Sequence, residues 1–222
     1  HRAVSRYKKM RLILVRHAQS KANAEGRWQG TMDFDLSKDG QGQCEKLRER
    51  FVKEELEPTH VYSSPLTRAY KTAEISLPAT PIHKIQDLRE NDAGVFSGKT
   101  SDELSTEYSV IFEEFRRSRN FDLVPKAETR YHIRQRAETV IGFLVKGHNS
   151  KDFVIAYSHS GFLVHLIGVI LGTNRVWNLR IPNTAIFDFE IDPDSWDLSS
   201  SIKGDRRGFR INRFADAGHL SC

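Results

Sequence analysis

The sequence predicts an α/β fold with a largely parallel sheet. Residues 11–15 and 153–157 are short, continuous apolar runs, which are typical of parallel strands buried on both faces. Segments in which apolar residues recur at helical spacing lie between such runs, and this alternation of strands and helices is characteristic of α/β proteins. With 222 residues, the chain can bury a stable core without disulfides or a structural metal.

The first third of the chain supplies two of the expected strands. After the strand at 11–15, apolar residues recur at helical spacing over 41–56, and charged residues occupy the other faces of that helix. A second, short strand is expected at 61–62. Directly after it, Ser64 suits the N-cap of another helix and Pro65 suits its first position.

The middle of the chain is rich in charged residues and helix formers. Helices are expected over about 102–117 and about 128–146. The strand at 153–157 follows, and then an apolar helix at 162–171. This part of the chain therefore continues the alternation of helices and strands.

The last part of the chain has a different pattern. Proline, aspartate and glycine turn signals separate three further expected strands, at 185–191, 198–202 and 209–214. Strands spaced this closely complete a sheet, some of them in antiparallel orientation. Because no linker or internal repeat divides the chain, we expect a single domain at 11–222, with a helical insertion at about 100–147 and a basic extension or expression remnant at 1–10.

The composition excludes several classes of protein. The 34 Lys and Arg against 29 Asp and Glu give a net charge of +5, which is compatible with an anionic ligand but does not identify one. The basic residues are scattered, and no RNP-like strand or zinc finger is present, so nucleic acid is not expected as a partner. Cys44 and Cys222 form neither a disulfide framework nor a zinc motif, which predicts a reducing compartment.

No membrane segment is expected. The longest apolar stretch, at 162–171, contains His165 and is too short for the roughly 20 residues that a membrane-spanning helix needs. Residues 1–10 are basic but lack the apolar region of a secretory signal. Together with the cysteine usage, these observations predict a cytoplasmic protein.

Two of the expected strands run into a histidine. Arg16 and His17 follow the strand at 11–15, and His159 comes just after the strand at 153–157. Ligands of open α/β sheets bind at the carboxyl ends of the strands. The two histidines are therefore candidates for one site.

The residues around the first histidine resemble a known signature. Residues 16–20, Arg-His-Ala-Gln-Ser, together with Asn23, are similar to the Arg-His-Gly-Glu/Gln-Thr/Ser-x-x-Asn motif of the histidine phosphatase superfamily, also called the phosphoglycerate mutase-like family. Further segments resemble the later blocks of this family in the same order, at 26–30, 63–73, 88–98, 157–161, 183–184 and 218–220. The resemblance covers almost the whole chain.

The resemblance implies a three-layer α/β/α fold with a mostly parallel sheet and a short helical insertion over the active site. It also implies the catalytic residues. His17 would attack phosphorus and form a phosphohistidine, and His159 would donate to the phosphoryl oxygens. Glu90 would be the general acid and base, and Arg16 and Arg68 would bind the phosphate with paired N–H donors.

The same resemblance implies further contacts to the substrate or its phosphate. These come from Asn23, Gln29, Gly30 and Ser160. The family usually has glycine at Ser160 and at Ala18, so we expect both side chains to lie near the phosphate and to affect the fit of the substrate. No metal or cofactor is implied, the expected partner is a small phosphorylated substrate, and the sequence does not define an oligomeric state.

The segment after Glu90 favours a phosphatase. Mutases of this family usually follow the acid with an Arg-x-Tyr-Gly run and carry a longer insertion that excludes water, whereas this chain continues Asn-Asp-Ala-Gly. We therefore expect hydrolysis of phosphate monoesters. A 2,3-bisphosphoglycerate-dependent phosphoglycerate mutase is the alternative. A non-catalytic regulatory protein on the same fold is a second one, although all the catalytic residues are present.

Overall fold

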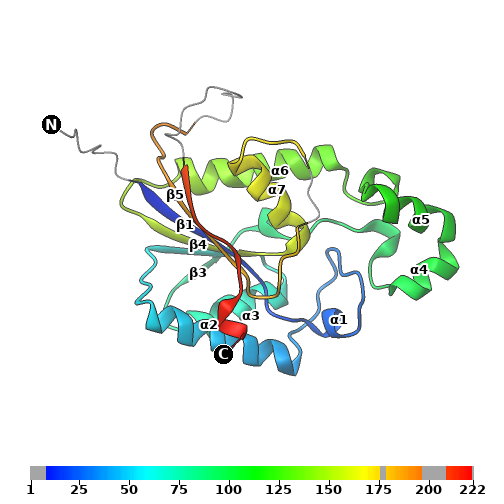
Figure 1. The fold of residues 1–222 in the computed structure, drawn as a ribbon, viewed down its shortest axis with the longest axis horizontal. Helices are drawn as coiled ribbons and strands as arrows, with labels where there is room; N and C mark the ends of the chain where they lie inside the picture. Colours follow the sequence, from blue (N-terminus) through cyan, green and yellow to red (C-terminus); the bar gives the residue numbers. More distant parts are fainter. Residues whose placement is uncertain (1–8, 176–178, 197–208, 222) are drawn as a thin grey trace.

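The computed structural model describes residues 9–175, 179–196 and 209–221, in which helices cover both faces of a six-stranded sheet (Figure 1). The strand order across the sheet is β3-β2-β4-β1-β5-β6. The strands are β1 (Met10–Arg16), β2 (His60–Ser63), β3 (Ile82–Lys84), β4 (Phe153–Ser158), β5 (Ile186–Ile191) and β6 (Phe209–Asp216). The strand expected at 198–202, Cys222 and residues 1–8 of the N-terminal extension lie outside the described residues.

Most of the strands run in one direction. β3, β2, β4 and β1 are parallel to one another, while β5 pairs antiparallel with β1 and β6 pairs antiparallel with β5. The predicted mostly parallel sheet is therefore confirmed, together with its antiparallel C-terminal part. In the pairing of β1 with β4, Arg16 lies opposite Ser158. His17 and His159, the next residues, consequently leave the sheet side by side.

Two layers of helices complete the predicted α/β/α arrangement (Figure 1). One face of the sheet is covered by α2 (Lys38–Lys53) and α3 (Thr67–Ser76), and the other by α6 (Arg130–Lys146) and α7 (Ser160–Ile170). The chain outside the cap also contains three short helices: α1 (Lys21–Ala24), η1 (Gln86–Leu88) and η4 (Gly218–Leu220).

The central strand β1 shows why both helical layers form. Successive side chains of a strand point to opposite faces. Leu12 and Leu14 accordingly join the core beside α6 and α7, while Ile13 and Val15 join the core beside α2 and α3. A continuous apolar run is thus what a strand covered on both faces requires.

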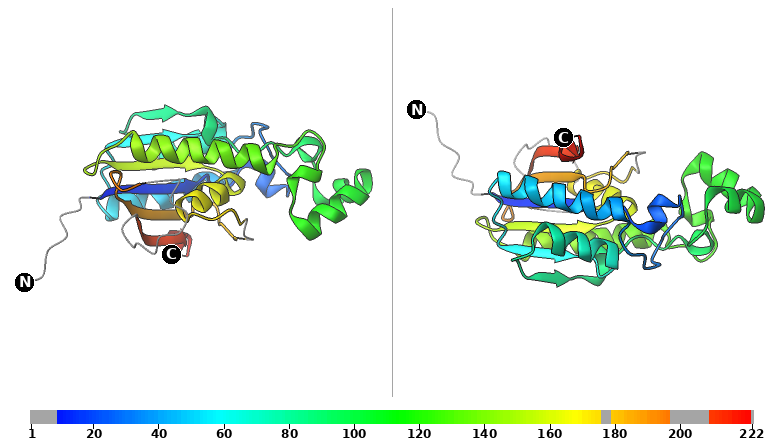
Figure 2. Two further views of the ribbon diagram at one scale, coloured as in Figure 1. Left: turned by 90° about the horizontal axis from the view of Figure 1, so that it is seen from above. Right: turned by 90° about the horizontal axis from the view of Figure 1, so that it is seen from below.

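A small helical region, called the cap below, spans residues 94–127 and projects beyond one end of the sheet (Figure 2). Its elements are η2 (Gly94–Phe96), α4 (Ser101–Glu107), α5 (Ser109–Ser118) and η3 (Phe121–Leu123). The cap has an apolar cluster of its own, made by Ala93, Phe96, Leu104, Phe112, Phe115 and Val124. The helix α6, which follows the cap, packs on the sheet instead.

Two predicted helices differ from the observed ones. The helix expected over about 102–117 is divided at Tyr108, whose backbone (φ −132°, ψ 37°) ends α4 and precedes α5. The helix expected over 41–56 begins earlier, at Lys38, because the hydroxyl of Ser37 accepts a hydrogen bond from the N–H of Gly40. It also ends earlier, at Lys53.

The predicted N-cap at Ser64 is wrong. α3 begins at Thr67 with Leu66 at the N-cap position, and no side chain of the helix caps it. Instead, the carboxylate of Asp33 accepts a hydrogen bond from the Thr67 N–H at 2.7 Å. A residue of a remote loop therefore caps the N-terminus of α3, and the hydroxyl of Ser64 is available for a contact elsewhere.

Within the described residues, no helix combines the length and the apolar composition that a membrane crossing requires.

Candidate active site

The two strand-end histidines lie in contact with each other. The centroids of the His17 and His159 rings are 5.0 Å apart, with 55° between the ring planes. Both side chains are buried. Parallel pairing of β1 with β4 is therefore sufficient to bring together two residues that are far apart in the sequence.

The hydrogen bonds of His17 define its tautomer. Its Nδ1 lies 2.6 Å from the carbonyl oxygen of Ala18, which can only accept, so Nδ1 carries the proton and Nε2 has the lone pair. Burial lowers the pKa of His17 well below its usual value, and the positive charges of Arg68 and Arg16 lower it further. The ring is consequently neutral at physiological pH, with Nε2 ready to act as a nucleophile.

His159 has the opposite tautomer. The Nε of Arg68 donates to its Nδ1 at 3.2 Å, so the proton is on Nε2, which donates to the hydroxyl of Ser64 at 2.8 Å. Burial lowers the pKa of His159 well below its usual value, again assisted by the charges of Arg68 and other neighbours. Ser64 is thus a direct neighbour of the site, a contact that its sequence context did not indicate.

Arg68 is fully buried beneath this histidine. Its Nη1 donates to the carbonyl of Met32 at 2.8 Å, and its Nη2 donates to the carbonyl of Gly30 at 3.0 Å. Burial lowers the pKa of Arg68 to about 10, so the side chain stays charged at neutral pH. Arg68 therefore fixes both His159 and the loop at Gly30 by hydrogen bonds, and it also brings a positive charge to the site.

Arg16 has one N–H donor that finds no acceptor among the described residues. Its Nη1 donates to the carbonyl of Ile181, but its Nε is buried and has no hydrogen-bond partner among the described residues. Burial lowers the pKa of Arg16 to about 10, against the opposing effect of the Glu90 carboxylate. Because buried N–H groups are nearly always paired, an unpaired one beside a cavity indicates a place for an anionic ligand.

Glu90 approaches the same cavity from the opposite side. Its carboxylate accepts hydrogen bonds from the backbone N–H groups of Asn91 (2.9 Å), Gly161 (3.1 Å) and Phe162 (2.9 Å). The last two belong to the first turn of α7, where N–H groups are unpaired and favour negative charge. A Cβ atom at Gly161 would lie 2.7 Å from Glu90 Oε1, so this contact requires glycine.

A cavity of about 250 Å³ joins these groups. Seven of the nine site residues expected from the sequence line it, namely Arg16, His17, Asn23, Gln29, Gly30, Glu90 and Ser160. The other two, His159 and Arg68, lie behind His17 through the contacts described above. Trp28 and Phe121 line the cavity from the side of the cap, and the sequence did not single them out.

The two departures from the usual glycine differ in their surroundings. Ser160 lines the cavity as expected. Ala18 does not, because its methyl group packs in a small apolar cluster with Leu36 and Cys44. Its N–H donates to the hydroxyl of Thr72 at 3.0 Å. The expectation that both side chains lie near the phosphate is therefore wrong for Ala18.

A larger cleft, of about 1260 Å³, adjoins the first cavity. The two share Trp28, Asn91, Phe121, Ser160 and Gly161 in their walls. The small cavity thus has charged and polar walls at the end of the sheet, and it opens toward a wider space between the cap, α6 and α7.

Comparison with known proteins agrees with this geometry. Residues 12–202 match the family model of the histidine phosphatase superfamily (branch 1). The chain is 29% identical over 186 residues to putative phosphoserine phosphatase 2 of Hydrogenobacter thermophilus, covering 82% of this chain and 90% of that protein. It is also 29% identical over 214 residues to phosphoglycerate mutase-like protein 4 of Arabidopsis thaliana, covering 93% and 90%. The crystal structure of Bacillus stearothermophilus YhfR superposes with a TM-score of 0.79 at 26% identity, covering 95% and 99%.

Proposed function

We propose that this chain, which belongs to the histidine phosphatase superfamily and is a phosphatase of that type, hydrolyses phosphate monoesters through a phosphohistidine on His17. The observation that carries the proposal is the pairing of a neutral imidazole, unprotonated at Nε2, with the unpartnered buried Nε of Arg16 at one cavity. The first supplies a nucleophile and the second a place for the phosphate.

The first half of the reaction transfers the phosphoryl group to the enzyme. Nε2 of His17 attacks phosphorus, the bond from phosphorus to the ester oxygen breaks, and its electron pair leaves with that oxygen. Glu90, as the general acid, gives a proton to the leaving alcohol. Arg16 stabilises the charge on the phosphoryl oxygens, which is the main requirement of phosphoryl transfer. The Nε2–H of His159 donates to the Ser64 hydroxyl in this structure, so it would have to exchange that partner for a phosphoryl oxygen to assist.

The second half returns the enzyme to its starting state. Glu90, now a carboxylate, takes a proton from a water molecule whose oxygen attacks the phosphohistidine. The bond from phosphorus to Nε2 breaks, inorganic phosphate leaves, and His17 regains its lone pair. The wide cleft that adjoins the cavity offers water a route toward the phosphohistidine, which favours water as the acceptor.

The small cavity and the adjoining cleft together indicate the class of substrate. The small cavity is matched to a phosphate group, and the adjoining cleft offers Trp28 and Phe121 to the organic part of a small phosphorylated metabolite. A mutase remains the alternative function, because one of the relatives is named a phosphoglycerate mutase-like protein. Mutase activity would require that the phosphohistidine transfers its phosphoryl group back to an organic acceptor before water reaches it.

One experiment tests the proposal and its alternative. Wild-type protein is incubated with a panel of phosphate monoesters, including phosphoserine, and separately with 3-phosphoglycerate plus a trace of 2,3-bisphosphoglycerate. We expect phosphate release and an acid-labile phosphoenzyme, both abolished in His17→Ala. Isomerisation of 3-phosphoglycerate without phosphate release would replace the phosphatase with a mutase. Absence of both turnover and phosphoenzyme would indicate a non-catalytic protein.

A further inference from the structure

Arg136 is a buried charged residue on an otherwise apolar face of α6. Its side chain is only 6% exposed, and its neighbours on this face, Ile133, Ala137 and Val140, belong to the core beside the sheet. Its guanidinium carbon lies 3.9 Å from the centroid of the Phe162 ring, in a cation–π contact. Burial of a guanidinium is costly unless its donors are paired, so its partners show what this residue does.

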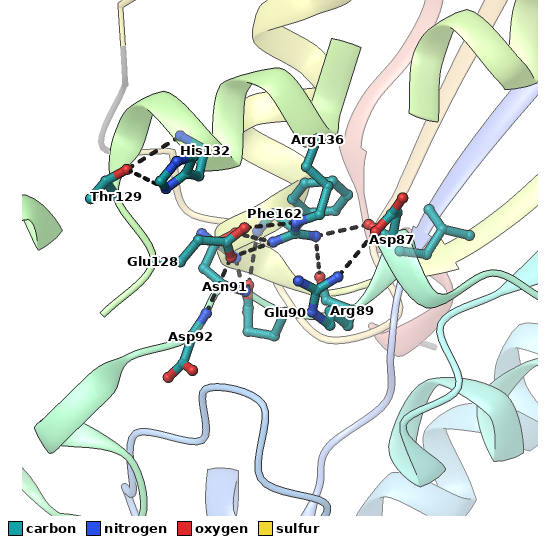
Figure 3. Close-up of polar contacts among 12 residues, drawn as sticks. Asp87, Arg89, Glu90, Asn91, Asp92, Glu128, Thr129, His132, Arg136 and Phe162 are labelled. Atoms are coloured by element: carbon teal, nitrogen blue, oxygen red, sulfur yellow. Dashed lines mark hydrogen bonds and ion pairs between the residues drawn. The ribbon is translucent and has the colours of Figure 1, made fainter. Parts of the chain in front are cut away.

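All the nitrogens of Arg136 donate to one short stretch of chain and to one carboxylate (Figure 3). Nη1 donates to the carbonyls of Asp87 (2.8 Å) and Arg89 (2.9 Å). Nη2 donates to the side-chain oxygen of Asn91 at 3.3 Å. Nε and Nη2 form a fork with the carboxylate of Glu128, at 2.9 and 2.7 Å. The guanidinium thus binds residues on both sides of Glu90.

The ring under Arg136 belongs to the residue that receives the Glu90 carboxylate. Phe162 donates its backbone N–H to Glu90 Oε1 at 2.9 Å, while its ring packs against the guanidinium. Arg136 therefore contacts both the segment that carries the acid and the helix start that holds its carboxylate. Among the described residues, none of the hydrogen bonds of Arg136 goes to the Glu90 carboxylate itself.

Glu128 holds the guanidinium and joins it to the end of the cap. Burial alone would raise the pKa of Glu128, but the hydrogen bonds and charge of Arg136 outweigh it and lower that pKa. The backbone N–H of Glu128 donates to the carbonyl of Asp92 at 3.0 Å, and the N–H of Asp92 donates back to the Glu128 carboxylate at 3.4 Å. The ion pair is thus anchored to the acid segment from a second direction.

We propose that Arg136, oriented by Glu128, is a positioning residue that fixes Glu90 for proton transfer, an inference that rests on the proposed role of Glu90 as general acid and base. A carboxylate on an irregular segment would otherwise move with that segment. Arg136 holds the segment 87–91 against the start of α7, so that the Glu90 carboxylate keeps a single position relative to the N–H groups of α7. Because general acid catalysis depends on hydrogen-bond reach to the leaving oxygen, a small displacement of Glu90 is enough to slow it.

The leaving group of the substrate distinguishes a positioning role of Arg136 from a merely structural one. Arg136→Lys keeps the charge, but a single ammonium cannot reach Glu128 and the carbonyls of Asp87 and Arg89 together. We expect kcat/KM to fall about 10²-fold on phenyl phosphate, whose leaving group needs a proton, and less than about tenfold on p-nitrophenyl phosphate. Glu90→Gln should show the same dependence with a larger loss, and Glu128→Gln a smaller one.

The matched control is Arg11→Lys. Arg11 also combines a carboxylate partner, Asp188 at 2.7 Å, with a phenylalanine ring, Phe153 at 4.7 Å, but it lies at the start of β1. We expect this control to retain the activity of the wild type on both substrates. Thermal unfolding of each variant shows whether it is folded. If Arg136→Lys does not fold, Glu128→Gln takes its place as the test of the positioning role.

The outcomes separate the two proposals. If Glu90→Gln loses activity in the expected leaving-group pattern but Arg136→Lys and Glu128→Gln lose it equally on both aryl phosphates, the positioning role is overturned and the proposed function stands. If Glu90→Gln itself loses activity equally on both, or the wild type releases no phosphate, the proposed function fails and the positioning role fails with it.

Discussion

The floor of the small cavity, formed by His17, Glu90 and Gly161 with His159 and Arg68 behind them, lies at the end of the sheet. The cap stands on a separate apolar cluster beyond that end (Figure 2). At the floor, directional hydrogen bonds fix His17, His159 and Arg68. In the cap, aromatic rings pack against one another and against Trp28. The centroid of the Phe115 ring lies 5.4 Å from that of Trp28, edge to face, and 4.7 Å from that of Phe121, in a tilted contact.

The difference indicates how the two regions divide their tasks. Hydrogen bonds set the angle and tautomer of a side chain, as chemistry on one phosphorus atom requires. Ring packing excludes water and supplies area, but it tolerates exchange of one apolar side chain for another. We therefore expect substitutions at the floor to change the rate of the chemical steps and those in the cap to change which substrate binds.

Of the substitutions that compare the two regions, Gly161→Ala, at the floor, is expected to have the largest effect. The added methyl group would lie 2.7 Å from Glu90 Oε1 and 3.0 Å from Asn91 Nδ2, so Glu90 must leave its hydrogen bonds to α7. Misplacement of a catalytic group by about 1 Å costs roughly 10²-fold in rate. We expect kcat on phenyl phosphate to fall by about this factor, measured at saturating substrate.

Gly142→Ala is the control for this change. A Cβ atom at Gly142 would meet no described atom within 4 Å, and the residue lies within α6, where alanine is a better helix former than glycine. The control should therefore keep full activity with unchanged or slightly higher stability. Full activity of Gly161→Ala would show that Glu90 does not need its contact with α7.

The sequence could predict the floor because it depends on local patterns. Apolar runs at 11–15 and 153–157 define two strands, and parallel pairing brings the residues after them to one edge of the sheet. The fold class and the proximity of His17 and His159 follow from these patterns. The expectation that Arg68 belongs to this region came from the resemblance, because on its own it reads as a cation on the surface of a helix.

Contacts that cross between elements could not be predicted. Ser64 has the sequence context of a helix cap, yet Asp33 caps α3 and Ser64 meets His159. Arg136 occurs among alternating charged residues of α6, so nothing local distinguishes it from an exposed arginine. The cap aromatics, such as Phe121, reach the cavity only because the chain folds back over the end of the sheet.

A smaller effect is expected in the cap, from Phe121→Ala. Phe121 lines both the small cavity and the wide cleft, so its loss removes apolar contact to the organic part of the substrate. We expect KM for an aryl phosphate to rise about tenfold, which corresponds to about 1.4 kcal/mol, with little change in kcat. Inhibition by inorganic phosphate, which contacts the floor, should be unchanged. A loss of kcat instead would mean that the cap also orders the floor.

The two regions are also expected to differ in their response to acid. Burial lowers the pKa of His17 and His159 well below the usual value, and those of His165 and His219 to about 4, while the cap at 94–127 contains no histidine. Below pH 6.5 the unfolded chain binds protons that the folded chain does not, so stability falls as the pH falls. Each histidine contributes up to ~1.4 kcal/mol per pH unit between its two pKa values.

Urea unfolding at pH 7 and pH 5.5 measures this loss, and hydrogen exchange locates it. We expect a lower unfolding midpoint at pH 5.5, with the decrease in protection concentrated in the strands and in α7 rather than in local openings of the cap. His165→Gln should make the pH dependence shallower by up to one proton, because it removes one of the histidines whose pKa is lowered in the folded chain. An equal loss of protection in the cap and at the floor would show that the two regions open as one unit, despite their separate apolar clusters.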